Sequence, residues 1–169
     1  MQTALMGSRV PRGMVLSAMA LAALALGVLV YLGDRAAGST WLIPPGTAWH
    51  GWHGFGPAAA WLPSALHTFA FALLSAALLP PRPALQGIAC IGWGTVNLAF
   101  ESGQHPSVAP WLAAALESAL PAALAQPLAQ YFRRGTFDPA DLVAVLMGGL
   151  AAWALLYWTH PEPETAHAL

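Results

Sequence analysis

Four long stretches of the chain are almost free of charged residues, and shorter polar segments separate them. A membrane-spanning helix needs about 20 mostly apolar residues, because each residue rises ~1.5 Å and the hydrocarbon core is ~30 Å thick. The pattern therefore predicts spanning helices over residues 14–32, 64–79, 84–100 and 141–158. The expected fold is all-α: a polytopic membrane helical bundle with four transmembrane helices.

The first stretch also resembles a secretory signal peptide, because Arg9 and Arg12 precede its apolar run. The run is long for a signal peptide, and no small-residue cleavage site directly follows Leu32. We therefore expect a retained span. Basic residues ahead of a first span favour the inner side of the membrane, which predicts a cytoplasmic segment 1–13. Over the whole chain the Arg residues divide equally between the two sides, so this orientation rests on the first span alone.

A fifth stretch, residues 110–132, is nearly uncharged but contains Pro121 and Pro127. Proline removes a backbone hydrogen-bond donor and interrupts helices. We therefore expect one or two short interfacial or re-entrant helices here, with a true fifth span as the alternative. Trp111 and Tyr131 lie near its ends, where aromatic side chains anchor segments at the membrane surface.

Two further segments lie outside these stretches. The loop 34–63 is rich in Trp, Gly and Pro, and Trp prefers the headgroup level, so we expect this loop on the membrane surface. Pro63 is expected to open the second span, where a missing N–H costs nothing. The segment 159–169 is predicted to be a flexible C-terminal tail, because chain ends without apolar anchors fray.

Composition agrees with a membrane protein. The chain has 169 residues, of which 57% are hydrophobic and 8% are charged. Soluble domains are about a quarter charged. The formal net charge is −1, so no basic surface is available to attract nucleic acid. These values exclude a disordered chain, a nucleic-acid-binding protein and a typical soluble enzyme. The expected partner is the lipid bilayer.

Polar residues are predicted to converge at one membrane face. Chain reversal places the start of the second span, the end of the third and the start of the fourth together. The residues concerned are His67, Asn97, Glu101, Gln104, Arg133, Arg134, Asp138 and Asp141. In the third span the polar positions continue a helical stripe of small residues, which should face protein rather than lipid. A carboxylate in lipid needs a partner, so we expect Glu101 to contact His67 or an Arg.

Each of these residues also has a structural explanation. Asp138 before Pro139 fits a helix N-cap, and Asp141 would complement the helix dipole in the first turn. The two Arg residues can solvate a surface loop, and His67 can bond a backbone carbonyl. A Glu–Arg or Glu–His pair can be structural or catalytic, and the residues leave both open.

Metal and cofactor sites are not expected. His50 and His53 have the i, i+3 spacing of metal ligands, but no further ligand lies near them in the sequence. The single cysteine, Cys90, lies within an apolar span and fits an inert small side chain. No glycine-rich phosphate-binding motif is present. We therefore predict no metal and no cofactor.

The segment from residue 64 to 158 resembles the VanZ-like family of bacterial membrane proteins. The resemblance rests on the His in LHTFAFALL, the Glu-x-x-Gln in FESGQ, and the run RRGTFDPADLVAVLMGG. Those motifs align His67, Glu101 and Gln104, then Arg133 or Arg134, then Asp138 or Asp141. The resemblance implies a VanZ-like domain over 14–158 in the bacterial cytoplasmic (inner) membrane. The family is named for a glycopeptide-resistance protein, and its molecular mechanism is not established.

Three functions remain open. The first is a VanZ-like protein acting at the outer face on the cell envelope, by binding an amphiphilic or lipid-linked small molecule through Glu101. The second is a membrane-embedded enzyme in which Glu101 works with His67 or Asp141 in acid–base chemistry. The third is a structural accessory subunit that binds a membrane-protein partner through its small-residue faces.

Overall fold

The computed structural model describes residues 10–34 and 52–160, and within them the chain forms six α-helices and no strand. The helices are α1 (Arg12–Asp34), α2 (Ala58–Leu78), α3 (Pro83–Gly103), α4 (Ala109–Ala119), α5 (Ala122–Arg134) and α6 (Pro139–Trp158). The all-α prediction is confirmed. By length and composition, α1, α2 and α6 are able to cross a membrane. Four such helices are not confirmed, because α3 has the length of α2 but more polar residues.

The second predicted span begins earlier than the sequence suggests. Pro63 is expected to open it, but α2 begins at Ala58 and Pro63 lies inside the helix. An internal proline costs a backbone hydrogen bond. Ala59 and Pro63 are both buried, so the apolar packing of this first turn and a half offsets that cost.

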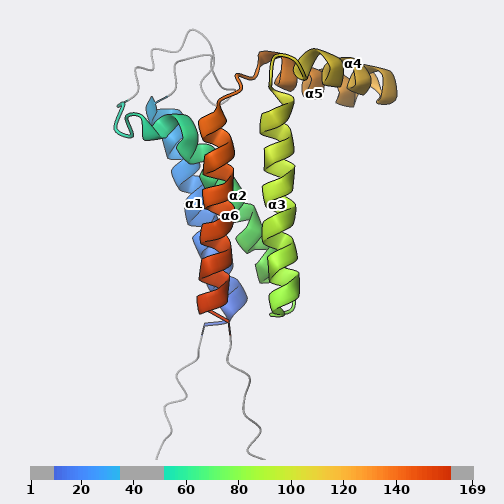
Figure 1. The fold of residues 1–169 in the computed structure, drawn as a ribbon. Coiled ribbons are helices and arrows are strands. Elements are labelled where there is room, and N and C mark those ends of the chain that lie inside the picture. Colours follow the sequence, from blue (N-terminus) through green and yellow to red (C-terminus); the bar gives the residue numbers. More distant parts are fainter. Residues whose placement is uncertain (1–9, 35–51, 161–169) are drawn as a thin grey trace, which may run out of the picture.

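Four helices form a bundle with α2 at its centre. α2 packs against α1, α3 and α6, and α6 also packs against α3 (Figure 1). Alanines dominate the core around the fully buried Leu73, among them Ala20, Ala70, Ala76 and Ala152. Small side chains let helix backbones approach closely where no water drives them together.

Large apolar side chains on the outer surface point away from this core. On α3 and α6 they include Ile88, Ile91, Leu146 and Leu150, each more than half exposed. A soluble protein rarely exposes so large an apolar surface. Together with the three apolar helices, this surface is consistent with association with a lipid bilayer.

The stretch 110–132 forms most of a helical hairpin. α4 and α5 pack against each other and project sideways from the end of the bundle, beginning at the C-terminal end of α3 (Figure 1). Pro121 separates them, with an extended backbone at ψ 142°, whereas Pro127 is accommodated inside α5. The sequence predicts one or two short helices here, and the structure has two.

At the opposite end of the bundle, Arg12 joins three helices. Its Nε donates to the carbonyl oxygen of Thr159 beyond α6, at 3.2 Å. Gln86 of α3 is only 3% exposed, and its side-chain oxygen, turned towards the guanidinium, accepts from both terminal nitrogens of Arg12 at 2.9 and 3.1 Å. This contact ties the start of α1 to the start of α3 and the end of α6.

Several sequence predictions fall outside the described residues: those for Arg9 and His50, for most of the Trp-rich loop, and for the tail beyond residue 160. Where the chain is described again, it lies against the end of α1. The backbone N–H of Trp52 donates to the Gly33 oxygen at 2.9 Å, and the indole of Trp52 occupies the space that a side chain on Gly33 would need. A side chain at position 33 would therefore displace the indole of Trp52.

Candidate functional site: a polar cluster above an apolar groove

Five polar side chains from four segments of the chain meet at the end of the bundle that carries the hairpin. They are Ser64, Glu101, Gln104, Tyr131 and Asp141, and we refer to them as the polar cluster. The Ser64 hydroxyl lies 2.9 Å from Asp141 Oδ1 and 3.4 Å from Glu101 Oε1. It therefore stands between two carboxylates contributed by α3 and α6.

Gln104 connects the cluster to the hairpin. Its side-chain nitrogen donates to Glu101 Oε2 at 3.3 Å and to the Tyr131 hydroxyl at 2.9 Å. Beside it, the ring of Phe132 stacks on Phe100 with centroids 5.6 Å apart. Phe132 also lies over Gly103, where an added Cβ would come within 2.6 Å of the ring. The ring of Tyr131 also meets Phe100 edge to face, with centroids 5.7 Å apart. α5 is thus held against the end of α3 by one hydrogen bond and by aromatic contacts.

Tyr131 remains a neutral phenol at physiological pH. Burial first, and then the negative charges of Glu101 and Asp141 with the nearby Tyr31, raises the pKa of Tyr131 to about 12. An unperturbed tyrosine titrates near 10. Because the folded-state pKa is the higher one, the stability this group contributes is complete below about pH 10 and is lost as the pH rises towards 12.

The structure brings together three of the residues predicted from sequence: Glu101, Gln104 and Asp141. Asp138 has the structural role foreseen for it, because it is the N-cap of α6 and accepts from the Ala140 N–H at 2.9 Å. Asp141 lies in the first turn of the same helix. It also binds Ser64, so its role extends beyond the helix dipole.

The remaining predicted residues lie elsewhere. His67 stacks on Phe71, with ring centroids 6.2 Å apart, and Asn97 donates to the carbonyl oxygen of Trp93 at 2.9 Å. Arg133 binds the exposed Glu117 of α4 with both terminal nitrogens. This ion pair lowers the pKa of the Glu117 carboxyl, chiefly through the hydrogen bonds from Arg133. Arg134 is exposed.

The expected contact of Glu101 with His67 or an Arg is not made within the described part of the chain; Ser64 and Gln104 take that place. The physical reason is that a half-buried carboxylate at a helix end needs hydrogen-bond donors, and these need not be cationic. Arg133 is engaged by Glu117, and the ring of His67 is held by Phe71.

Sequence reasoning misses two members of the cluster. It places Ser64 only at the start of a span, and Tyr131 only as an interfacial anchor. Ser64 precedes His67 by three residues and shares its helix face, which is the available signal. For Tyr131 the sequence holds no such signal, because its position depends on how the hairpin folds back onto α3.

The one candidate metal-ligand pair is only half described. His50 lies outside the described residues, and the Nδ1 atom of His53 is 4.0 Å from Asp34 Oδ1 with its side chain 72% exposed. No group of three or more His, Cys, Asp or Glu side chains within residues 10–34 and 52–160 is placed to share a metal ion.

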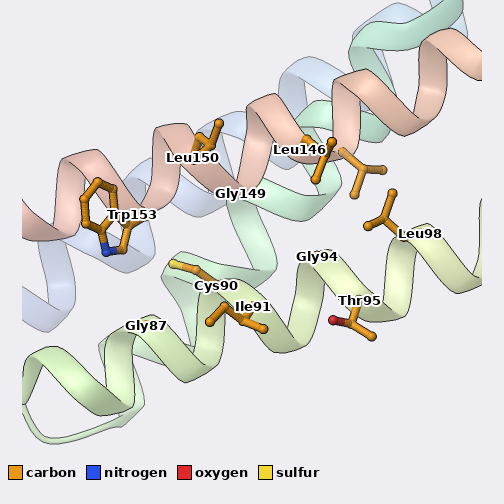
Figure 2. Close-up of a pocket in the computed structure, with 11 residues that line it drawn as sticks. Gly87, Cys90, Ile91, Gly94, Thr95, Leu98, Leu146, Gly149, Leu150 and Trp153 are labelled. Carbon is orange, nitrogen blue, oxygen red and sulfur yellow. The ribbon is translucent and has the colours of Figure 1, made fainter.

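An apolar groove runs between α3 and α6 below the polar cluster. Its volume is about 360 Å³, within the range of small-molecule sites. Figure 2 shows Ile91, Gly94 and Leu98 on one side, with Leu146 and Trp153 on the other. An added Cβ at Gly87 or Gly94 would meet nothing within 4 Å, so the missing side chains on α3 leave this space open.

The groove ends one helical turn below the two carboxylates. Leu98 lines it and lies three residues before Glu101 on α3; Val145 lines it and lies four residues after Asp141 on α6. Residues three or four apart share a helix face. The site therefore has an apolar part along the bundle and a polar part at its end, an arrangement that matches an amphiphilic molecule.

Comparisons with models of known protein families, with curated proteins and with solved structures found no match for this chain.

Proposed function

We propose that this chain is a multi-pass membrane protein with four spanning helices, α1, α2, α3 and α6. Support for α3 as the fourth comes from its length of 21 residues and from its position against α2 and α6. At the rise of an α-helix this length reaches roughly 31 Å. The polar side chains of α3 have partners within the protein: Gln86 with Arg12, Asn97 with Trp93, and Glu101 with the cluster. Such pairing is what a polar residue in a span requires.

The proposed membrane is a bacterial cytoplasmic membrane, with the polar cluster at its outer face. The start of α1, with Arg12, lies at the end of the bundle opposite the cluster (Figure 1). Basic residues ahead of the first span favour that end as cytoplasmic, and the orientation rests on this span because Arg133 and Arg134 lie at the cluster end. The hairpin would lie in the outer interface. Leu124, Leu128 and Tyr131 form one stripe along α5, and its other face carries Gln and Arg residues, as expected of an interfacial helix.

This topology predicts which positions share a side of the membrane. In protein carrying Cys90→Ala, single cysteines at Ser107→Cys and Thr136→Cys should react with an impermeant maleimide from one side of sealed vesicles. Pro81→Cys, between α2 and α3, should react only from the other side. Labelling of all three from the same side would show that α3 does not span. Reaction of Ser107→Cys and Thr136→Cys from opposite sides would show that residues 110–132 span instead.

Within this membrane the proposed function is binding of an amphiphilic molecule, in keeping with the VanZ-like resemblance. The observation that carries it is an apolar groove that ends one helical turn from the polar cluster. An alkyl chain would lie between α3 and α6, and the head of the molecule would meet Glu101. Action on the cell envelope would follow from binding such a molecule at the outer face.

A photoreactive ligand tests this function. An alkyl chain bearing a diazirine, offered with a hydroxyl, phosphate or ammonium head, should label groove residues such as Ile91 and Leu146 in the purified full chain. Gly94→Leu should reduce that labelling several-fold, because leucine would fill the groove. Gly92→Leu is the matched control, since Gly92 lies on the same helix, is exposed and does not line the groove. Equal labelling of the two variants with every head group would overturn the proposal.

A further inference from the structure

The hydrogen bonds of Glu101 indicate the chemical class of the head group that the proposed ligand carries. An ionised carboxylate offers about four acceptor positions, and its bonds to donors in proteins are typically about 2.7–2.9 Å long. Glu101 has two donors near it, Ser64 at 3.4 Å and Gln104 at 3.3 Å. Both distances are at the long end of the hydrogen-bond range, so the acceptor capacity of Glu101 is only partly used.

Both neighbours share their protons between Glu101 and a nearer acceptor. A serine hydroxyl carries one proton, and Ser64 lies much closer to Asp141, at 2.9 Å, than to Glu101. The amide nitrogen of Gln104 carries two protons; one is directed to Tyr131 at 2.9 Å and the other to Glu101 at 3.3 Å. Glu101 therefore receives at most one or two long hydrogen bonds, and acceptor positions on its carboxylate stay open.

No cation balances Glu101 within the described part of the chain. The described ion pairs join Arg133 with Glu117 and His53 with Asp34, and neither involves Glu101. The carboxylate of Glu101 therefore repels an anionic head group and attracts a cationic one.

The groove indicates the size and chemistry of the ligand's apolar tail. Its lining on α3 extends from Gly87 to Leu98. Over that stretch the helix rises roughly 16 Å, which is about half of a ~30 Å hydrocarbon core. The groove thus has the length of one leaflet, and its apolar lining would accept one alkyl chain lying along the bundle. It begins one turn from Glu101, at the level where a lipid head group would lie.

We propose that the site binds a membrane amphiphile with a protonated amine head, drawn from the leaflet on the hairpin side. Its ammonium group donates hydrogen bonds to Glu101, and its alkyl chain lies in the groove between α3 and α6. This inference rests on the proposed amphiphile-binding function and adds the chemical class of the head. Charge complementarity and the unused acceptors of Glu101 select the ammonium over a phosphate or a hydroxyl.

Head-group competition with the full chain tests the inference. The diazirine probe is held fixed, and unlabelled alkyl chains of equal length compete, with an ammonium, hydroxyl or phosphate head. The ammonium competitor should be effective at a concentration about tenfold or more below the hydroxyl one, as the loss of a charge-assisted hydrogen bond implies. The phosphate competitor should be weakest. A short amine without an alkyl chain should compete poorly.

Variants separate the head from the chain. Glu101→Gln keeps the shape of the side chain but removes its charge, and should abolish the preference for ammonium while labelling of the groove by the hydroxyl probe persists. Glu117→Gln is the matched control, because it removes an exposed carboxylate outside the cluster, and it should leave the preference unchanged. The head-group panel on the unmodified chain gives an answer even if Glu101→Gln fails to fold.

The outcomes distinguish the two proposals. The inference about the head group is overturned if the ammonium, hydroxyl and phosphate competitors act equally, or if the short amine acts as well as the long one. Binding of an alkyl chain in the groove is then judged separately, by the labelling of the Gly94→Leu and Gly92→Leu variants. A preference for ammonium that survives Glu101→Gln would also overturn the assigned contact. If no probe labels the groove in the unmodified chain, the proposed function itself fails.

Discussion

Gly148→Ala is expected to lower the free energy of unfolding by about 2–3 kcal/mol, near the upper end of what overpacking costs in helical cores. A Cβ at position 148 of α6 would overlap the carbonyl oxygen of Ala65 on α2 and come within 2.9 Å of its carbon. The obstacle is backbone, so no side-chain rotation relieves it. α6 and α2 would have to move apart, and both belong to the core of the bundle.

The measurement is denaturant unfolding of the purified protein in detergent, followed by circular dichroism. Gly92→Ala is the control, because an added Cβ there meets nothing within 4 Å. Alanine favours the helix over glycine by up to ~1 kcal/mol, so the control should be as stable as the parent or slightly more so. If Gly148→Ala unfolds at the same denaturant concentration as Gly92→Ala, the close approach of α2 and α6 is wrong.

Arg12→Ala should produce the second large effect, a loss of about 2–3 kcal/mol, the range for hydrogen bonds to a charged group together with the buried amide left behind. Gln86 is 3% exposed, and without the guanidinium its side-chain oxygen loses both donors. The end of α6 loses the donor to Thr159 at the same time. The same unfolding measurement applies, and Arg134→Ala, which removes an exposed Arg, should change stability little.

A double variant shows where the cost of Arg12→Ala arises. Replacing both partners of a buried hydrogen bond with apolar groups is often close to neutral, whereas removing one leaves a buried polar group unsatisfied. Arg12→Ala with Gln86→Leu should therefore be more stable than Arg12→Ala alone. Failure of Gln86→Leu to recover any stability would show that the buried amide is not the source of the loss.

The helical elements could be predicted from the chain alone, because spanning length and uninterrupted apolar character are local properties. Prolines and an N-cap Asp also indicate features that need no tertiary contact, such as the break at Pro121 and the start of α6 at Pro139. The prediction for Pro63 was wrong because its tolerance inside α2 depends on burial against other helices, which a single segment does not reveal.

The candidate site was predicted only in part. Glu101, Gln104 and Asp141 could be placed at one face by chain reversal and helical periodicity. Their hydrogen-bond partners depend on the rotation and depth of one helix relative to another. Each step of one position along a helix turns the side-chain direction by about 100°. For that reason the structure places Ser64 and Tyr131 in the cluster. His67 instead stacks on Phe71, and Arg133 forms an ion pair with Glu117.

The sequence by itself determined that this is a helical protein with apolar stretches long enough for a membrane, because those properties depend on residue type and spacing. Tertiary structure alone decided that Gly148 meets the backbone of Ala65, that Ser64 stands between two carboxylates, and that the glycines of α3 open a groove rather than receive a neighbouring helix. Each of these depends on how far apart two helices lie and how they are rotated. Those quantities are set by the packing of every side chain between the helices, and no local pattern encodes them.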